Sequence, residues 1–179
     1  KAAGTQQTIE HLNLQLGEIR LDQPITVALY FTAKSGAPAI ESMIRLSGQV
    51  TPTHAFKRIA VDALKVEAKA NGKGLPGGKQ EATLTAQLAY AADQRTLEIK
   101  DLILSALELT LHGQARGTGI GGDTPRLEGD LRLERCVPRS VLQALGLQSI
   151  ETSDRGVLNK AEAAFVFQAT SESLQLSKL

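Results

Sequence analysis

The sequence has no tryptophan, and its 179 residues include only four phenylalanines and two tyrosines. Hydrophobic residues nevertheless make up 42% of the chain, so any apolar surface must be built mainly from leucine, isoleucine, valine and alanine. Sugar-binding modules commonly present aromatic platforms, and the chain has little material for one. The scarcity of aromatic residues therefore argues against a carbohydrate-binding sandwich.

An excess of charge of one sign is also missing. Twenty basic residues stand against nineteen acidic ones, for a net charge of +1. A nucleic-acid-binding domain usually carries a basic excess, so we expect no nucleic-acid partner. The linear sequence also holds no Lys/Arg cluster of the kind that binds an anionic membrane surface.

Cysteine and long apolar runs are scarce as well. The single cysteine, Cys136, cannot form an internal disulfide. No apolar run approaches the roughly 20 residues of a membrane-spanning helix. The chain starts at Lys1 without an initiator methionine or a signal peptide, and we expect it to be one β-rich segment, residues 1–179, of a longer protein.

A glycine-rich stretch imitates a nucleotide-binding motif. Gly117, Gly119 and Gly122 match the spacing G-x-G-x-x-G. In a dinucleotide site that motif follows a strand and opens a helix, whose N-terminus faces the pyrophosphate. Here Asp123-Thr124-Pro125 and another strand-like segment follow, which indicates a plain hairpin loop and no nucleotide cofactor.

The remaining polar residues show no spacing typical of a metal site or a catalytic site. The three histidines, His11, His54 and His112, are not spaced to share a metal ion. The carboxylates Glu128, Asp130 and Glu134 interleave with Arg126, Arg132 and Arg135, a pattern typical of cross-strand pairing on a solvated face. Catalytic carboxylates need a shielded site that shifts one pKa. We therefore expect no enzyme activity, no metal and no cofactor.

Period-two alternation of apolar and polar residues is the dominant pattern that is present. It runs through Ile25–Phe31, Ala82–Tyr90, Leu107–Leu111, Leu127–Leu133 and Phe165–Phe167. Weaker alternation covers 9–16, 40–50, 59–70, 97–103 and 174–176. Alternation sends one set of side chains to each side of a strand, so the chain predicts about ten strands.

Short connections between these segments, such as the tight turn predicted over Ala92–Arg95, favour antiparallel neighbours. Two short helices are expected, one over Pro138–Leu145 and one over 154–160, because Pro138 suits a first turn and Gly146 a stop. We therefore predict an all-β fold, a strongly twisted or curved antiparallel sheet that can form an open groove, with two short helices. A two-sheet β-sandwich is the alternative architecture.

An ordered series of segments runs through 59–179, none of them specific by itself. They are Val61–Ala68, Gly74–Gly78, Leu88–Tyr90, Asp93–Leu97, Leu102–Gly113, Leu127–Leu131, Val137–Gly146, Thr152–Asp154 and Ala163–Phe167. In this order the segments resemble the AsmA family of Gram-negative envelope proteins. The chain departs from the pattern at Gln148-Ser149-Ile150, where a proline-containing link is expected.

The resemblance implies a long β-rich body in the periplasm, behind an N-terminal inner-membrane helix that is absent here. It also implies a role in outer-membrane biogenesis and a likeness to bridge-like carriers, whose curved sheets hold acyl chains in an apolar groove. The favoured function is therefore transport or positioning of phospholipid between the inner and outer membranes. A scaffold or assembly factor for outer-membrane proteins is the alternative.

Candidate groove residues come from two segments rich in leucine. Leu107, Leu109, Leu111, Leu127, Leu131 and Leu133 are predicted to line one apolar side of neighbouring strands. Smooth aliphatic walls suit acyl chains, since each buried CH₂ contributes about 0.8 kcal/mol. The same residues suit a closed hydrophobic core, and the sequence leaves these two readings open.

Overall fold

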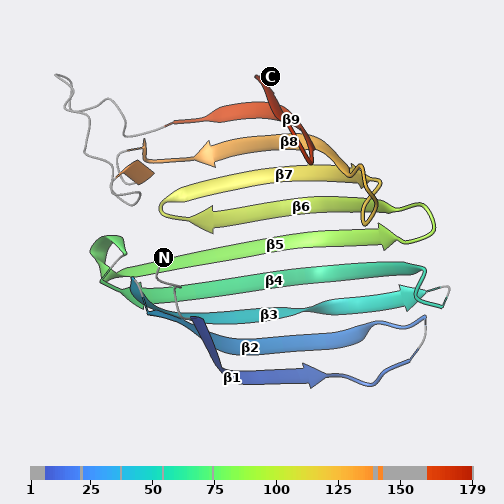
Figure 1. Ribbon diagram of the computed structural model, residues 1–179, viewed down its shortest axis with the longest axis horizontal. Coiled ribbons are helices and arrows are strands. Elements are labelled where there is room, and N and C mark those ends of the chain that lie inside the picture. Colours follow the sequence, from blue (N-terminus) through green and yellow to red (C-terminus); the bar gives the residue numbers. More distant parts are fainter. Residues whose placement is uncertain are drawn as a thin grey trace, which may run out of the picture.

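The described residues form a single antiparallel β-sheet of ten strands, which lie side by side in the order of the sequence (Figure 1). The computed structural model describes residues 7–20, 22–36, 38–53, 55–73, 75–138, 141–142 and 161–178. The strands are β1 Gln7–Leu16, β2 Ile25–Gly36, β3 Ala39–Thr53, β4 Arg58–Gly72, β5 Lys79–Ala91, β6 Thr96–Ala106, β7 Leu109–Thr118, β8 Arg126–Arg135, β9 Ala163–Thr170 and β10 Leu174–Lys178. The predicted all-β, antiparallel fold is confirmed, and the two-sheet sandwich is wrong because all ten strands share one sheet.

Short turns explain most of this simple order, although β8 and β9 are separated by the longer segment 136–162. β6 and β7 are joined by two residues, Leu107 and Glu108, and β5 and β6 by the predicted turn at 92–95. Such connections bring each strand back beside the preceding one, so consecutive strands pair antiparallel. The open sheet leaves β1 and β10 as its two edges.

Bulges that contain a residue with positive φ interrupt the ladders on three of the described strands. His11 in β1, Ala63 in β4 and Asp101 in β6 have φ angles of 54°, 51° and 50°, and the pairing register shifts beside each of them. A bulge inserts one unpaired residue, bends the strand and increases its local twist. Bulges on β1, β4 and β6 therefore introduce bends at several places across the sheet.

Helical structure is scarce in the described part of the chain. A 3-10 turn, η1, covers Pro76–Gly78. Of the predicted helix over Pro138–Leu145, the structure describes Pro138, Val141 and Leu142, with a hydrogen bond of 3.1 Å from the Val141 N–H to the Val137 carbonyl. The predicted helix over 154–160 lies outside the described residues.

A closed hydrophobic core is missing from the described residues. Among them, no large side chain is fully buried, and the buried hydrophobic residues are Ile25, Ala86, Cys136 and Phe167. A closed domain of this length would bury about 70% of the surface of the unfolded chain, with many fully buried side chains. The described residues therefore form one layer, without a second layer packed on it. No described helix is long and apolar enough to cross a membrane.

Candidate functional site

One side of the sheet is apolar across all ten strands. Directly paired residues of antiparallel neighbours point to the same side, so the register assigns every strand residue to a face. Leu29 pairs with Leu46, Leu84 with Leu104, and Leu111 with Leu133, which joins β2–β3, β5–β6 and β7–β8 on one side. We call this side the apolar face.

The apolar face is dominated by aliphatic side chains. In β1 to β5 it holds Ile9, Leu14, Leu16, Ile25, Val27, Leu29, Phe31, Ala33, Ile40, Ile44, Leu46, Val50, Ile59, Val61, Leu64, Val66, Ala68, Ala82, Leu84, Ala86, Leu88 and Tyr90. In β6 to β10 it holds Leu97, Ile99, Leu102, Leu104, Ala106, Leu109, Leu111, Ala115, Leu127, Leu131, Leu133, Ala163, Phe165, Phe167, Ala169, Leu174 and Leu176. Most of these side chains are half-buried by their neighbours in the sheet.

The two edge strands expose their apolar residues most. Ile9, Leu12, Leu14 and Leu16 in β1, with Leu174 and Leu176 in β10, are between 51% and 68% exposed. Each edge residue has in-sheet neighbours on one side only. A large apolar surface of this kind usually marks a binding surface, because monomeric proteins rarely expose apolar patches above a few hundred Å².

Glycines on the apolar face make room for the largest side chains near them. A Cβ added at Gly129 would lie 2.9 Å from Cε1 of Phe167, the residue paired with it in β9. A Cβ at Gly113 would lie 2.5 Å from Cδ2 of Leu131. Phe167 and Leu131 therefore lie over glycines of neighbouring strands, which keeps the surface of β7 to β9 filled and smooth.

Five of the six predicted groove residues lie together on the apolar face. Leu109 and Leu111 come from β7, and Leu127, Leu131 and Leu133 from β8. Leu107 lies elsewhere: with a φ of 53° it forms the β6–β7 turn together with Glu108, so the predicted strand begins two residues later, at Leu109. Only the strand residues can line the face.

The prediction from sequence missed most of the apolar face, although its signal was present. Alternation in Ile25–Phe31 and Ala82–Tyr90 predicted strands with an apolar side. Their side chains turn out to share the face with the five leucines, because each strand pairs in register with the next. Alternation alone does not say which apolar sides face the same way.

The opposite side of the sheet carries the charges, paired along and across strands. The Lys34 ammonium donates a hydrogen bond of 2.6 Å to Glu10, which lowers the pKa of the Glu10 carboxyl and raises the pKa of Lys34. A hydrogen bond from Lys65 likewise lowers the pKa of Glu67. These shifts favour the charged forms, whereas a general acid near neutral pH needs a carboxyl that stays protonated.

The acidic residues singled out from the sequence lie on this polar side. Glu128 and Glu134 are exposed, and Asp130 accepts a hydrogen bond of 2.8 Å from the Gln114 amide. Glu128 and Asp130 border an open hollow of about 370 Å³ whose rim mixes both signs of charge, including Lys100 and Arg116. Within the described ranges, no group of three or more His, Cys, Asp and Glu residues is placed to hold a metal ion.

Asp130 supplies a test of how solvated this side is. We expect Asp130→Ala to lower the free energy of unfolding by less than about 1 kcal/mol, because its partner Gln114 is exposed and can bond to water instead. Urea denaturation of the two proteins measures the difference. A loss of about 3 kcal/mol or more would reveal a buried polar network and contradict this assignment.

No protein-family model, curated protein or solved structure matches the chain. Function must therefore be argued from the geometry of the sheet. Its most unusual feature is the apolar face, which no described element covers.

Proposed function

We propose that the chain is a non-enzymatic lipid-handling segment, whose apolar face holds the acyl chains of phospholipids. The observation that carries the proposal is the continuity of this face across ten strands without a second layer among the described residues. In water such a surface favours an apolar occupant. Acyl chains fit because they are long, flexible and need no specific polar partner.

The chemistry of the face supports an aliphatic ligand. Each methylene that leaves water contributes about 0.8 kcal/mol, so even part of an acyl chain supplies substantial binding energy. The apolar face offers leucine, isoleucine, valine and alanine in rows, and the chain has no tryptophan. Such walls hold chains loosely enough for them to slide or exchange.

Curvature would turn this face into a groove. The bulges at His11, Ala63 and Asp101 bend three strands distributed across the sheet. We propose that these bends make the apolar side concave, so that an acyl chain contacts several strands at once. A groove shields more of the chain from water than a flat surface does.

The place of the protein in the cell is proposed from the resemblance to the AsmA family. We propose that the parent protein lies in the periplasm of a Gram-negative cell, anchored in the inner membrane by an N-terminal helix. There it would contribute to outer-membrane biogenesis by carrying or positioning phospholipid between the two membranes. The ordered segments within 59–179 and the uncovered apolar face support this assignment independently of each other.

A scaffold for outer-membrane proteins is the second candidate, and the edge strands favour it. Among the described residues, β1 and β10 each have one side without a neighbouring strand, and both carry exposed leucines. An extended client segment can add to such an edge through backbone hydrogen bonds. In that case the ligand would be a polypeptide strand and not a lipid.

Mass spectrometry of material extracted from the protein tests the proposed function. The chain would be expressed in the periplasm of a Gram-negative host and purified without detergent. We expect phospholipid to copurify in near-stoichiometric amount, since removing it exposes the apolar face to water. Lipid-free protein that captures unfolded outer-membrane proteins through β1 or β10 would overturn the carrier and support the scaffold.

A further inference from the structure

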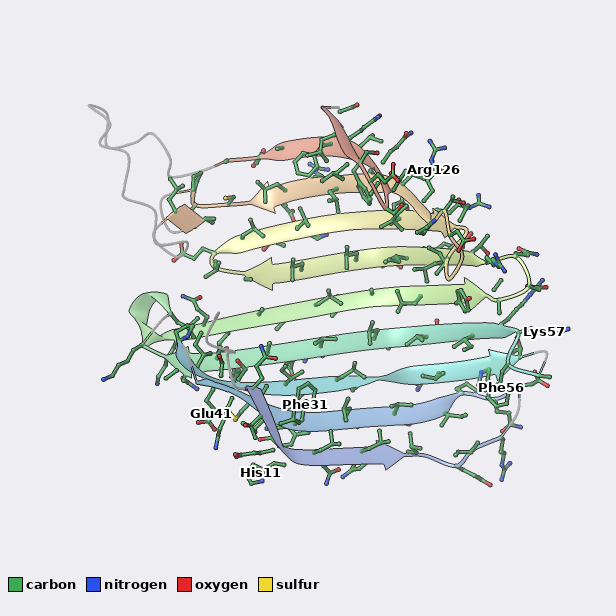
Figure 2. All side chains as sticks on the ribbon, in the orientation of Figure 1. His11, Phe31, Glu41, Phe56, Lys57 and Arg126 are labelled. Carbon is green, nitrogen blue, oxygen red and sulfur yellow. The ribbon has the colours of Figure 1, made fainter. Side chains whose placement is uncertain are left out.

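One end of the apolar face carries polar side chains. At this end of β1 to β5, the pairing register assigns to the apolar face Gln7, Ser35, Ser42 and Gln80. We call these four residues the polar border. In Figure 2, Glu41, the residue before Ser42, marks this end of the sheet, and Phe56 and Lys57 mark the opposite end.

The opposite end of the apolar face differs in its chemistry. There the paired strand residues of β3 to β6 are Pro52, Ile59, Tyr90 and Leu97. Of these four side chains, only that of Tyr90 has a polar atom, its hydroxyl. A ligand with one polar end and one apolar end is therefore bound best when its polar end lies at the polar border, because a polar group in apolar surroundings needs a hydrogen-bonding partner.

Two hydroxyls of the polar border have no hydrogen-bonding partner in the described part of the chain. Ser35 and Ser42 are half-buried, and neither side chain forms a hydrogen bond with a described residue. Ser42 pairs with Ala33 and Ala70, whose methyl groups are too short to cover its hydroxyl. Both O–H groups are thus free to donate to an acceptor that a ligand brings, which removes the cost of leaving them unpaired.

The two hydroxyls are close enough to bind one ligand. Ser35 of β2 pairs directly with Ile40 of β3, and Ser42 follows Ile40 by two residues on the same side of the sheet. Ser35 and Ser42 are therefore diagonal neighbours, and such neighbours lie about 7 Å apart. A glycerol backbone with its ester and phosphate oxygens spans a similar distance, so a single phospholipid can accept a hydrogen bond from each serine.

The apolar face is long enough to hold acyl chains between its two ends. From Ser42 to Pro52, β3 advances by ten residues, a rise of about 33 Å. The hydrocarbon core of a bilayer is about 30 Å thick and contains two layers of acyl chains, so one layer takes about 15 Å. A phospholipid held at Ser42 can therefore keep the full length of its chains on the apolar face.

We propose that Ser35 and Ser42 form a binding site for the polar head of a phospholipid. Their O–H groups donate hydrogen bonds to ester carbonyl or phosphate oxygens, and the acyl chains run over the apolar face towards Pro52 and Ile59. The inference rests on the proposed function and adds an orientation to it, because each bound lipid lies with its head at the polar border. A fatty acid carboxylate offers similar acceptor oxygens, so the tests separate the two ligands.

Crosslinking of the full chain to three photoactivatable probes tests the site. The probes are a monomeric short-chain phosphatidylcholine, a fatty acid and a hydrocarbon without a polar group. We expect the double variant Ser35→Ala/Ser42→Ala to capture the phosphatidylcholine about tenfold more weakly, since two hydrogen bonds are lost, and to capture the hydrocarbon normally. The control Ser47→Ala/Ser105→Ala removes two hydroxyls from the opposite side of the sheet and should capture all three probes normally.

The position of the crosslinks tests the orientation of the lipid. Two phosphatidylcholines are compared, one with the photoactivatable group next to the glycerol and one with it at the methyl end of an acyl chain. Mass spectrometry of the digested protein locates the labelled residues. We expect the first probe to label the ends of β2 and β3 that carry Ser35 and Ser42, and the second to label residues nearer to Pro52 and Ile59. The same labelling pattern for both probes would overturn the proposal.

Failure of the head site can be told apart from failure of the proposed function. If the unchanged protein captures phosphatidylcholine and Ser35→Ala/Ser42→Ala captures it equally well, the head site is refuted and the lipid-binding face stands. A loss confined to the fatty acid would identify a carboxylate as the ligand and also refute the phospholipid head site. If the unchanged protein captures none of the three probes, the proposed function and the head site both fail.

Discussion

Replacing Gly129 by alanine should lower the free energy of unfolding by about 2 kcal/mol, the cost typical of overpacking. The added Cβ would lie 2.9 Å from the Phe167 ring and would also collide with the Gln114 carbonyl of β7. Phe167 is only 9% exposed, so its ring has little freedom to move away. The backbone of β7 cannot yield without weakening its pairing with β8.

Gly48→Ala is the matched control for this substitution. Gly48 lies in β3 on the same face, and the nearest atoms to an added Cβ are at 3.4 Å, an ordinary contact distance. Urea denaturation should therefore show a change within about 0.5 kcal/mol for Gly48→Ala. Equal effects of the two substitutions would mean that the packing of Phe167 over Gly129 is not as described.

Placing arginine on the apolar face should abolish acyl-chain capture while the protein stays folded. In Leu131→Arg and Leu109→Arg, the arginine stem can lie along the face and its guanidinium can reach water, because no described element covers these residues. We expect a loss of at least about tenfold in crosslinking to a photoactivatable phospholipid. That factor equals about 1.4 kcal/mol, the contribution of roughly two buried methylenes.

Gln114→Arg serves as the control, since it adds the same charge to β7 on the opposite side of the sheet. It should crosslink as the unchanged protein does. Melting temperatures of all three variants report whether they remain folded. If Leu131→Arg and Leu109→Arg both unfold and the unchanged protein captures no lipid, the leucines belong to a closed core, where a buried unpaired charge is prohibitive. The scaffold would then be the better account.

Two turns of the sheet differ in how well the local sequence predicts them. The turn at 92–95 was predicted, because Asp93 and its neighbours have ordinary turn chemistry. The turn at Leu107 and Glu108 was not, because both residues have positive φ angles that leucine and glutamate seldom adopt. Their apolar–polar order continued the alternation of the flanking strands, which hid the reversal of the chain.

The amino-acid sequence by itself determined that the chain forms strands and that each strand has an apolar and a polar side. Period-two alternation is a local property, and every strand from Ile25–Gly36 to Leu174–Lys178 follows from it.

Only the tertiary structure decided that these sides join into one face. Pairing register decides this, since a slip by one residue would turn Leu131 and its neighbours to the polar side. The bulge at Ala63 shows the same dependence, because it keeps Val61 and Leu64 on one side although they are three residues apart. Whether the apolar sides close on each other or stay open is decided by contacts between distant strands, which alternation does not encode.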